Sequence, residues 1–229
     1  MSLTYGSQAG IVLSMCDRTG VMVEPWLEAG YECWIVDQQH PAGVHRDGLL
    51  VRVGADLTRW LPPRVEYRIV FGFPPCTHLA VSGARWFQDK GLPGLAAAIE
   101  VVEAVRDRCE WSGAPWMIEN PVGTLSTYWR KPDHRFDPCD FGGWVDGDAY
   151  TKKTCLWTGN GFRFPPLRRV EPVLGSYMHT LPPSDDRGDL RSVTPRGFAR
   201  AVFEANEHPV ELDEPDLTVG RLFPAEAAS

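Results

Sequence analysis

Three residues with chemically useful side chains come at or just after short apolar runs of the chain. Cys76 follows two prolines behind the run at 68–73, while Asp37 and Glu119 close two further runs. A thiolate is a nucleophile, and a carboxyl group can bind hydroxyls or transfer a proton. A buried structural role is the alternative for Cys76, because free cysteine is among the most buried residue types.

The elements that must position these residues alternate between strands and helices. Strands are predicted at 11–13, in a run ending at Asp37, and at 51–57, 68–73, 114–121 and 152–159. Helices are predicted from near Pro25 to Gly30, between Pro93 and Gly113, and at the end with Thr194 as N-cap and Pro195 as first helical residue. This alternation predicts an α/β fold with a Rossmann-like, doubly wound and mostly parallel sheet. In such a sheet we expect Asp37, Cys76 and Glu119 to lie at the same edge, where the parallel strands end.

The domain organisation follows from length and composition. At 229 residues the chain can form one sizeable core. We expect one domain over 1–207, with a loop-rich insertion at about 126–192. The acidic segment 208–229 is expected to be a mobile tail.

Charge and cysteine spacing exclude several classes of protein. A net charge of -7 argues against a strongly basic nucleic-acid binder, although residues 126–200 carry 12 basic and 9 acidic side chains. No apolar run is long enough for a membrane span and no signal peptide is apparent, so we expect a cytoplasmic protein without a membrane partner. The six cysteines are scattered without metal-ligand spacing, which predicts free thiols and no metal.

The first predicted turn points to a class of cofactor. The stretch CDRTG at 16–20 holds a single glycine and is not a G-x-G-x-x-G phosphate cradle. It favours a cofactor that contains adenosine but no pyrophosphate. Asp37, directly after the second strand, suits ribose hydroxyls, as in many nucleotide-binding folds.

Several motifs in order resemble those of the DNA cytosine-5 methyltransferases, a Rossmann-like family that uses S-adenosylmethionine. GFPPC and IENP resemble the fourth and sixth motifs, VLSMCDRTG and EAGYECWIVD the first and second, and GADL the third. TKKTCLWTG loosely resembles the eighth motif and RSVTPRGFAR the ninth. About thirty residues separate the eighth and ninth motifs, where the family inserts a target-recognition domain. The chain therefore resembles a short form lacking most of that domain.

The resemblance implies a role for each matching position. Cys76 is the implied nucleophile at cytosine C6, and Glu119 the acid that holds N3 and the exocyclic amine. Asn120 belongs to the same catalytic motif, and Lys153 stands where the eighth motif has an arginine. The implied cofactor-binding residues are Cys16, Asp17, Arg18, Thr19, Gly20, Asp37, Gln38, Asp56, Leu57, Phe73 and Pro75. The expected substrate-binding residues are Pro74, Ser82, Arg85 and Pro121.

Within this scheme each cofactor group has an expected partner. Asp37 would bind the ribose, Asp56 the adenine amino group, and the turn at 16–20 the methionine part. Cys16 is also interpreted as a packing residue. His78, two residues after Cys76, is interpreted as a loop histidine rather than the base of a Cys-His pair.

The sequence thus predicts methyl transfer from S-adenosylmethionine to cytosine C5, most simply in DNA, through a covalent cysteine adduct at C6. One alternative is C5 modification of a free pyrimidine nucleotide, or use of a modified cofactor beside Arg18. Another is a non-catalytic nucleic-acid or nucleotide binding module on a methyltransferase fold. The expected partners are DNA and an accessory target-recognition subunit.

Overall fold

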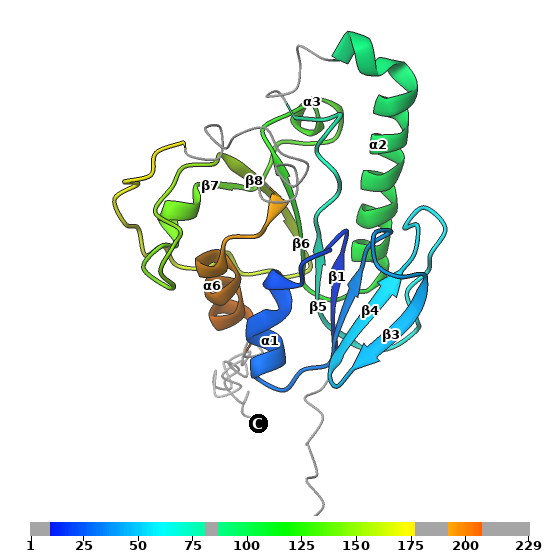
Figure 1. Ribbon diagram of the computed structural model, residues 1–229, viewed down its shortest axis with the longest axis horizontal. Coiled ribbons are helices and arrows are strands. Elements are labelled where there is room, and N and C mark those ends of the chain that lie inside the picture. Colours follow the sequence, from blue (N-terminus) through cyan, green and yellow to red (C-terminus); the bar gives the residue numbers. More distant parts are fainter. Residues whose placement is uncertain (1–9, 81–86, 177–191, 208–229) are drawn as a thin grey trace, which may run out of the picture.

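The computed structural model describes residues 10–80, 87–176 and 192–207. Within these residues lies an eight-stranded sheet of order β3-β4-β2-β1-β5-β6-β8-β7 (Figure 1). The strands are β1 (Ile11–Met15), β2 (Cys33–Val36), β3 (Gly43–Asp47), β4 (Leu50–Gly54), β5 (Tyr67–Gly72), β6 (Trp116–Pro121), β7 (His134–Phe136) and β8 (Thr154–Gly159). The helices are η1 (Val21–Val23), α1 (Glu24–Glu28), α2 (Phe87–Trp111), α3 (Leu125–Tyr128), η3 (Pro138–Asp140) and α6 (Arg196–Asn206).

The centre of the sheet is parallel. Strands β4, β2, β1, β5 and β6 pair in parallel, whereas β8 runs antiparallel to β6 and to β7. Strand β3 is an antiparallel addition to the outer edge of β4. This order confirms the predicted fold class as far as a Rossmann-like, mostly parallel sheet.

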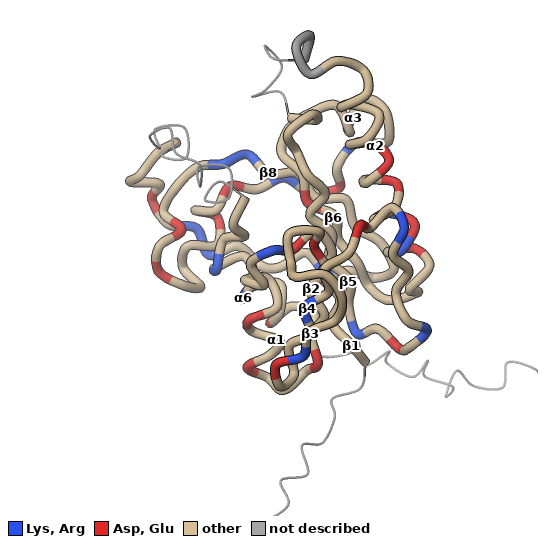
Figure 2. Tube along the Cα trace, turned by 45° about the vertical axis from the view of Figure 1, so that its right-hand side comes forward, with Lys and Arg blue, Asp and Glu red and all other residues tan. Residues whose placement is uncertain are grey.

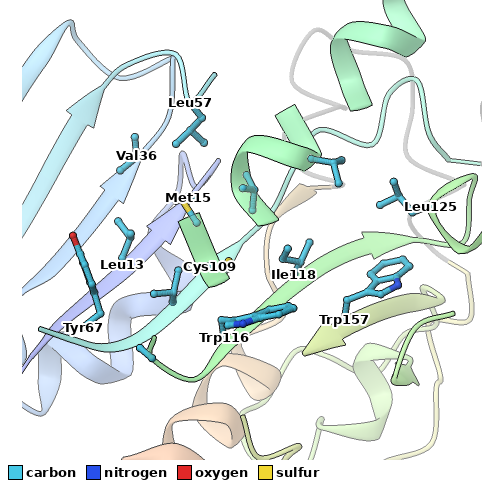
Figure 3. Close-up of a cluster of buried hydrophobic side chains, with 14 of the residues drawn as sticks. Leu13, Met15, Val36, Leu57, Tyr67, Cys109, Trp116, Ile118, Leu125 and Trp157 are labelled. Carbon is cyan, nitrogen blue, oxygen red and sulfur yellow. The ribbon is translucent and has the colours of Figure 1, made fainter. Parts of the chain in front are cut away.

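Helix α2 covers one face of the sheet. Its inward residues Val102, Val105 and Cys109 join a core with Leu13 and Met15 of β1. Figure 3 shows this cluster continuing past Ile118 to the indole of Trp157. Close packing explains why β5 ends in glycine, because a Cβ at Gly72 would lie 2.3 Å from Val105 Cγ1.

Helices α1 and α6 cover the opposite face (Figure 1). Trp26 of α1 is fully buried there and meets Phe203 of α6 edge-on, with ring centroids 5.1 Å apart. Ion pairs join Arg200 to Glu28 and Arg196 to Glu24 across the same two helices. The sheet is therefore doubly wound, as predicted, with one hydrophobic core on each face.

Most of the predicted strands and helices are confirmed, and the differences have local causes. The strand predicted at 51–57 already ends at Gly54, because Asp56 opens a turn in which its carboxylate accepts from the Thr58 amide. The prediction of Thr194 as N-cap is wrong, because Pro195 occupies that position without a side-chain cap. The carboxylate of Asp148, 49 residues away, instead accepts a 2.7 Å hydrogen bond from the Gly197 amide.

Strands β3 and β7 are additions that the pattern did not reveal. Within the predicted loop-rich insertion, β7 and β8 form the end of the sheet, whereas residues 160–176 contain neither helix nor strand. The predicted tail at 208–229 lies outside the described residues. No helix in the described part of the chain is long and apolar enough to cross a membrane.

Candidate active site

The three candidate residues predicted from the sequence lie at one edge of the sheet. Asp37 follows the last residue of β2, Cys76 lies four residues beyond β5, and Glu119 lies in the second half of β6. Because β2, β1, β5 and β6 are parallel neighbours, their carboxyl ends share an edge. The topology thus brings the three residues to the same side of the molecule.

The loop after β5 carries an exposed thiol. Cys76 is exposed and forms no disulfide, so its interpretation as a buried structural cysteine is wrong. Pro74 is buried, and its carbonyl accepts a 2.8 Å hydrogen bond from Asn120 Nδ2. Cys76 follows Pro74 by two residues, which span at most about 7 Å, so the loop that carries the thiol is held next to β6, the strand that carries Glu119.

Glu119 sits in an environment that favours its neutral form. The side chain is half-buried, and burial raises the pKa of its carboxyl above the ordinary value for a glutamate. The positive charge of Lys152 opposes this rise and pulls the pKa back down. A carboxyl with a raised pKa can donate a proton near neutral pH, which is the task of a general acid.

Lys152, which the motif match did not single out, is the cation that acts on Glu119. Side chains alternate across a strand, and Glu119 faces Leu156 of β8. Lys152 lies two residues before β8, on the parity of Leu156 and Thr154, and its charge acts on Glu119, whereas Lys153 has the opposite parity. Lys153 is exposed. A role for Lys153 on the base or on a phosphate stays a prediction.

The turn after β1 is built around Asp17. Its Oδ2 accepts from the Ser14 hydroxyl at 2.7 Å, while its Oδ1 accepts from the amides of Gly20 at 2.7 Å and Thr19 at 3.1 Å. The aspartate is buried and holds the turn from inside, leaving Arg18 and Thr19 exposed on the outer side.

Cys16 adopts an unusual backbone conformation in the same turn. Its φ is 54°, a left-handed value that non-glycine residues rarely adopt and that is enriched at ligand-binding sites. Burial, with the negative charges of Asp37 and Asp17, raises the pKa of its thiol far above the ordinary value. The thiol therefore stays neutral, and Cys16 packs against the core on the α2 side.

Two carboxylates follow the neighbouring strands β2 and β4 at this edge of the sheet. Asp37 accepts from the Gln39 amide at 2.8 Å through Oδ1, and Gln38 beside it is exposed. Asp56 is exposed, and hydrogen bonds from the Thr58 amide and hydroxyl lower its pKa. In each carboxylate, Oδ2 has no hydrogen-bond partner among the described residues. Both carboxylates can therefore accept from a ligand.

The other predicted positions contribute mainly through the backbone or lie elsewhere. Leu57 is buried in the core, and the Phe73 amide donates to the Met15 carbonyl at 3.0 Å. Pro75 is exposed beside Cys76, and Pro121 pairs with Thr154 where β8 begins. Ser82 and Arg85 lie outside the described residues.

Two residues that sequence reasoning treated otherwise or missed lie beside these loops. The ring of His78 packs against Gly94, where a Cβ would lie 2.6 Å from its Cε1. Its buried Nδ1 has no hydrogen-bond partner among the described residues. His40 was missed: its Nε2 lies 3.1 Å from the Asp17 carbonyl and joins the loop after β2 to the turn after β1. No spacing rule could have revealed that contact.

The rest of the described structure offers no metal site, and its hollow lies away from Cys76. Within the described ranges, no group of three or more His, Cys, Asp or Glu residues could hold a metal ion. A shallow hollow lined by Arg64, Val65, Glu66, Trp111 and Ser112 lies at the amino end of β5, the edge opposite Cys76.

Comparisons with known proteins add only weak likenesses. No family model and no curated protein matches the chain. Among solved structures, the CcbJ methyltransferase from Streptomyces caelestis is 17% identical with a TM-score of 0.31, over 56% of this chain and 49% of that one. The glycopeptide N-methyltransferase MtfA is 12% identical with a TM-score of 0.29, over 57% and 53%. The chain thus spans about half the length of these two proteins, and overlaps of this extent do not bear on its activity.

Proposed function

We propose that this chain transfers a methyl group from S-adenosylmethionine to C5 of cytosine in DNA, through a covalent bond between Cys76 and C6. One observation carries the proposal. An exposed cysteine on a loop tied to β6 lies at the same edge of the sheet as a glutamate of β6 whose pKa is raised by burial. The resemblance of GFPPC and IENP to the cytosine-5 methyltransferase motifs supports the same assignment.

The two groups perform complementary parts of the reaction. The Cys76 thiolate adds to C6, and the electron pair of the C5–C6 double bond moves into the ring as Glu119 donates a proton to N3. C5 of the resulting enamine is then nucleophilic enough to take a methyl group. Loss of the C5 proton to a base then supplies the electron pair that re-forms the C5–C6 double bond and expels the thiolate, and N3 returns its proton to the Glu119 carboxylate. Glu119 must be protonated at the first step, which its raised pKa favours.

The same edge fits S-adenosylmethionine, which when bound supplies an electrophilic methyl group on sulfur. Asp37 and Asp56 each present a carboxylate oxygen that can accept from ribose hydroxyls or an adenine amine. The turn at 16–20 has an exposed outer side and needs no pyrophosphate cradle. The chain's own part is to bind and orient the cofactor.

A basic strip favours nucleic acid over a free nucleotide as substrate. Arg135 pairs with Cys155 across β7 and β8, and Lys152 and Lys153 directly precede β8. No salt bridge joins these three cations to a carboxylate of the described residues. Figure 2 shows basic positions gathered beside β8. Such cations bind phosphates and release counterions, which strengthens binding to a polyanion.

The short connection between β8 and α6 points to help from a partner. Its described part, residues 160–176, has no helix or strand with which to read a sequence. Extruding a base from a duplex requires a few kcal/mol of unstacking and unpairing. An accessory target-recognition subunit would supply contacts that the described part of this connection does not offer.

Transfer of labelled methyl from S-adenosylmethionine to duplex DNA, single-stranded DNA, RNA and dCMP tests the proposal, with Cys76→Ala as control. Cysteine-dependent label in DNA is the expected result. Label in dCMP alone would favour the nucleotide alternative. Cofactor-independent binding of DNA that Cys76→Ala leaves unchanged, without label in any acceptor, would favour the binding module.

A trapping experiment tests the covalent step directly. An oligonucleotide with 5-fluorocytosine has no C5 proton to lose after methyl transfer, so the adduct with Cys76 should persist on a denaturing gel. Cys76→Ser should abolish this band, while a fluorine-free oligonucleotide should give none. A persistent band with Cys76→Ser would place the nucleophile elsewhere.

A further inference from the structure

We infer that residues 120–124, where the chain leaves β6, form a clamp that positions the Cys76 thiol relative to Glu119. Asn120 and Gly123 are its positioning residues. The inference rests on the proposed function for its catalytic meaning, but the contacts that define the clamp do not depend on it.

The first contact of the clamp lies before the thiol. Asn120 is 1% exposed, and its Nδ2 donates to the Pro74 carbonyl at 2.8 Å. Its Oδ1 is buried without a partner among the described residues. A buried amide with an unpaired oxygen is unfavourable, so the bond to Pro74 is the contact that this side chain provides. Through this bond Asn120 acts on the loop that carries Cys76.

The second contact lies after the thiol. Ala80 forms a β-bridge with Gly123, and the Thr124 amide donates to the Leu79 carbonyl at 2.9 Å. A Cβ on Gly123 would lie 2.1 Å from that carbonyl oxygen, a distance that real Cβ atoms do not show. Only glycine permits this approach without moving the backbone.

Between the two contacts the loop is a closed turn. The Cys76 carbonyl accepts from the amides of Leu79 and Ala80, each at 2.9 Å. The thiol therefore belongs to a short turn that is fixed on both sides by the same segment.

That segment is itself anchored, so both reacting groups share one support. Glu119 directly precedes Asn120, and Leu125 directly follows the clamp at the start of α3. Leu125 is 4% exposed and packs into the core on the α2 side (Figure 3). The clamp thereby links the nucleophile and the acid through five residues of backbone. Reaction rates depend on such placement, and a displacement of about 1 Å can lower a rate by about 10²-fold.

Asn120→Ala and Gly123→Ala test the clamp, with Gly197→Ala as matched control. A Cβ at Gly197 would lie 2.3 Å from the Phe141 carbonyl oxygen, a similar backbone clash beside α6. We expect both clamp variants to lower kcat by about 10²-fold with little change in the KM for S-adenosylmethionine. Amide hydrogen exchange at Leu79, Ala80 and Thr124 should accelerate in the same variants. Gly197→Ala should change neither the exchange of these amides nor the ratio of kcat to KM.

A conservative variant separates positioning from general destabilisation. Asn120→Asp has nearly the same shape, but only its protonated carboxyl can donate to the Pro74 carbonyl. Its kcat relative to that of the native protein should therefore recover as the pH is lowered, whereas the relative kcat of Asn120→Ala should not.

Two results distinguish failure of the clamp from failure of the proposed function. If the native protein transfers methyl but the clamp variants lose no more kcat than Gly197→Ala, the clamp is wrong and the function stands. If the native protein methylates no acceptor, the proposed function fails. Amide hydrogen exchange then tests the clamp by itself. Faster exchange in the clamp variants, confined to residues 76–80 and 124, supports the clamp, and unchanged exchange rates overturn it.

Discussion

Asp17 and Gly20 close the turn after β1, with the Gly20 amide donating to Asp17 Oδ1 at 2.7 Å. Gly20 has a φ of 74°, so the turn needs glycine at this position. The Asp17 carboxylate also accepts from Ser14 and Thr19 within the same turn. This turn therefore has its shape before any ligand binds, which lowers the entropy lost on binding.

Asp17→Ala should weaken both the fold and cofactor binding, whereas Asp37→Ala should weaken cofactor binding alone. Removing Asp17 leaves buried donors unpaired and should lower the free energy of unfolding by about 1–3 kcal/mol. Asp37 is half-buried and accepts only from Gln39 in the described structure. Urea unfolding and calorimetric titration with S-adenosylmethionine measure the two effects. Equal stability of the two variants would contradict the role given to Asp17.

Glu119→Gln should make the protein more stable at pH 8 and leave its stability unchanged near pH 4. Burial raises the pKa of Glu119 above 4.5 in the folded state, so the folded chain holds this proton more tightly than the unfolded chain. That contribution to stability is complete below the unfolded pKa and is lost as the pH rises through the folded pKa. Glutamine cannot ionise, so the variant does not lose this stability as the pH rises.

Urea unfolding of both proteins across this pH range measures the difference. In the same variant, methyl transfer should fall by about 10²–10⁴-fold, because glutamine cannot donate the proton. Parallel stability curves for the two proteins would show that Glu119 has no raised pKa.

How much of this fold could be predicted depends on where the information lies. The parallel strands were predictable because each is an apolar, β-branched run with turn residues after it. Strand β3 was not, because all five of its residues, GVHRD, are exposed and show no alternation. Its strand conformation comes from pairing with β4. Strand β7 has three residues, too few for any periodic pattern.

Some features of the candidate site could likewise be predicted from local sequence, and others could not. Pro74 and Pro75 mark the end of β5, so the position of Cys76 at the sheet edge could be predicted. The contact of Asn120 with Pro74 joins residues 46 apart, and nothing in either local stretch encodes it. Lys152 could have been found, since strand alternation from the strand predicted at 152–159 separates the faces of the two lysines.

Asp148→Ala should destabilise α6, whereas Thr194→Val should have little effect on it. The Asp148 carboxylate accepts from the Gly197 amide in the first turn of the helix, where intrahelical partners are lacking. Loss of such an acceptor lowers the free energy of unfolding by about 0.5–2 kcal/mol. Thr194 precedes the N-cap, and valine keeps its shape. Thermal unfolding compares the two variants, and a larger loss in Thr194→Val would restore Thr194 as the cap.

Lys152→Met and Lys153→Met should differ in the pH dependence of methyl transfer. The charge of Lys152 lowers the pKa of Glu119, so its removal raises that pKa further and keeps Glu119 protonated to higher pH. The alkaline limb of the profile of kcat/KM should therefore move to higher pH in Lys152→Met. Lys153 is exposed and is not the cation that acts on Glu119, so Lys153→Met should leave that limb in place.

The same pair should behave alike in binding to DNA. If both ammonium groups contact phosphates, each variant should reduce the slope of log K against log salt by about 1. Equal salt slopes with unequal pH profiles would show that Lys152 alone combines phosphate binding with control of Glu119. The alkaline limb of the kcat/KM profile could instead move equally in both variants. That result would mean that the net charge of the basic strip, rather than the position of Lys152, sets the protonation of Glu119.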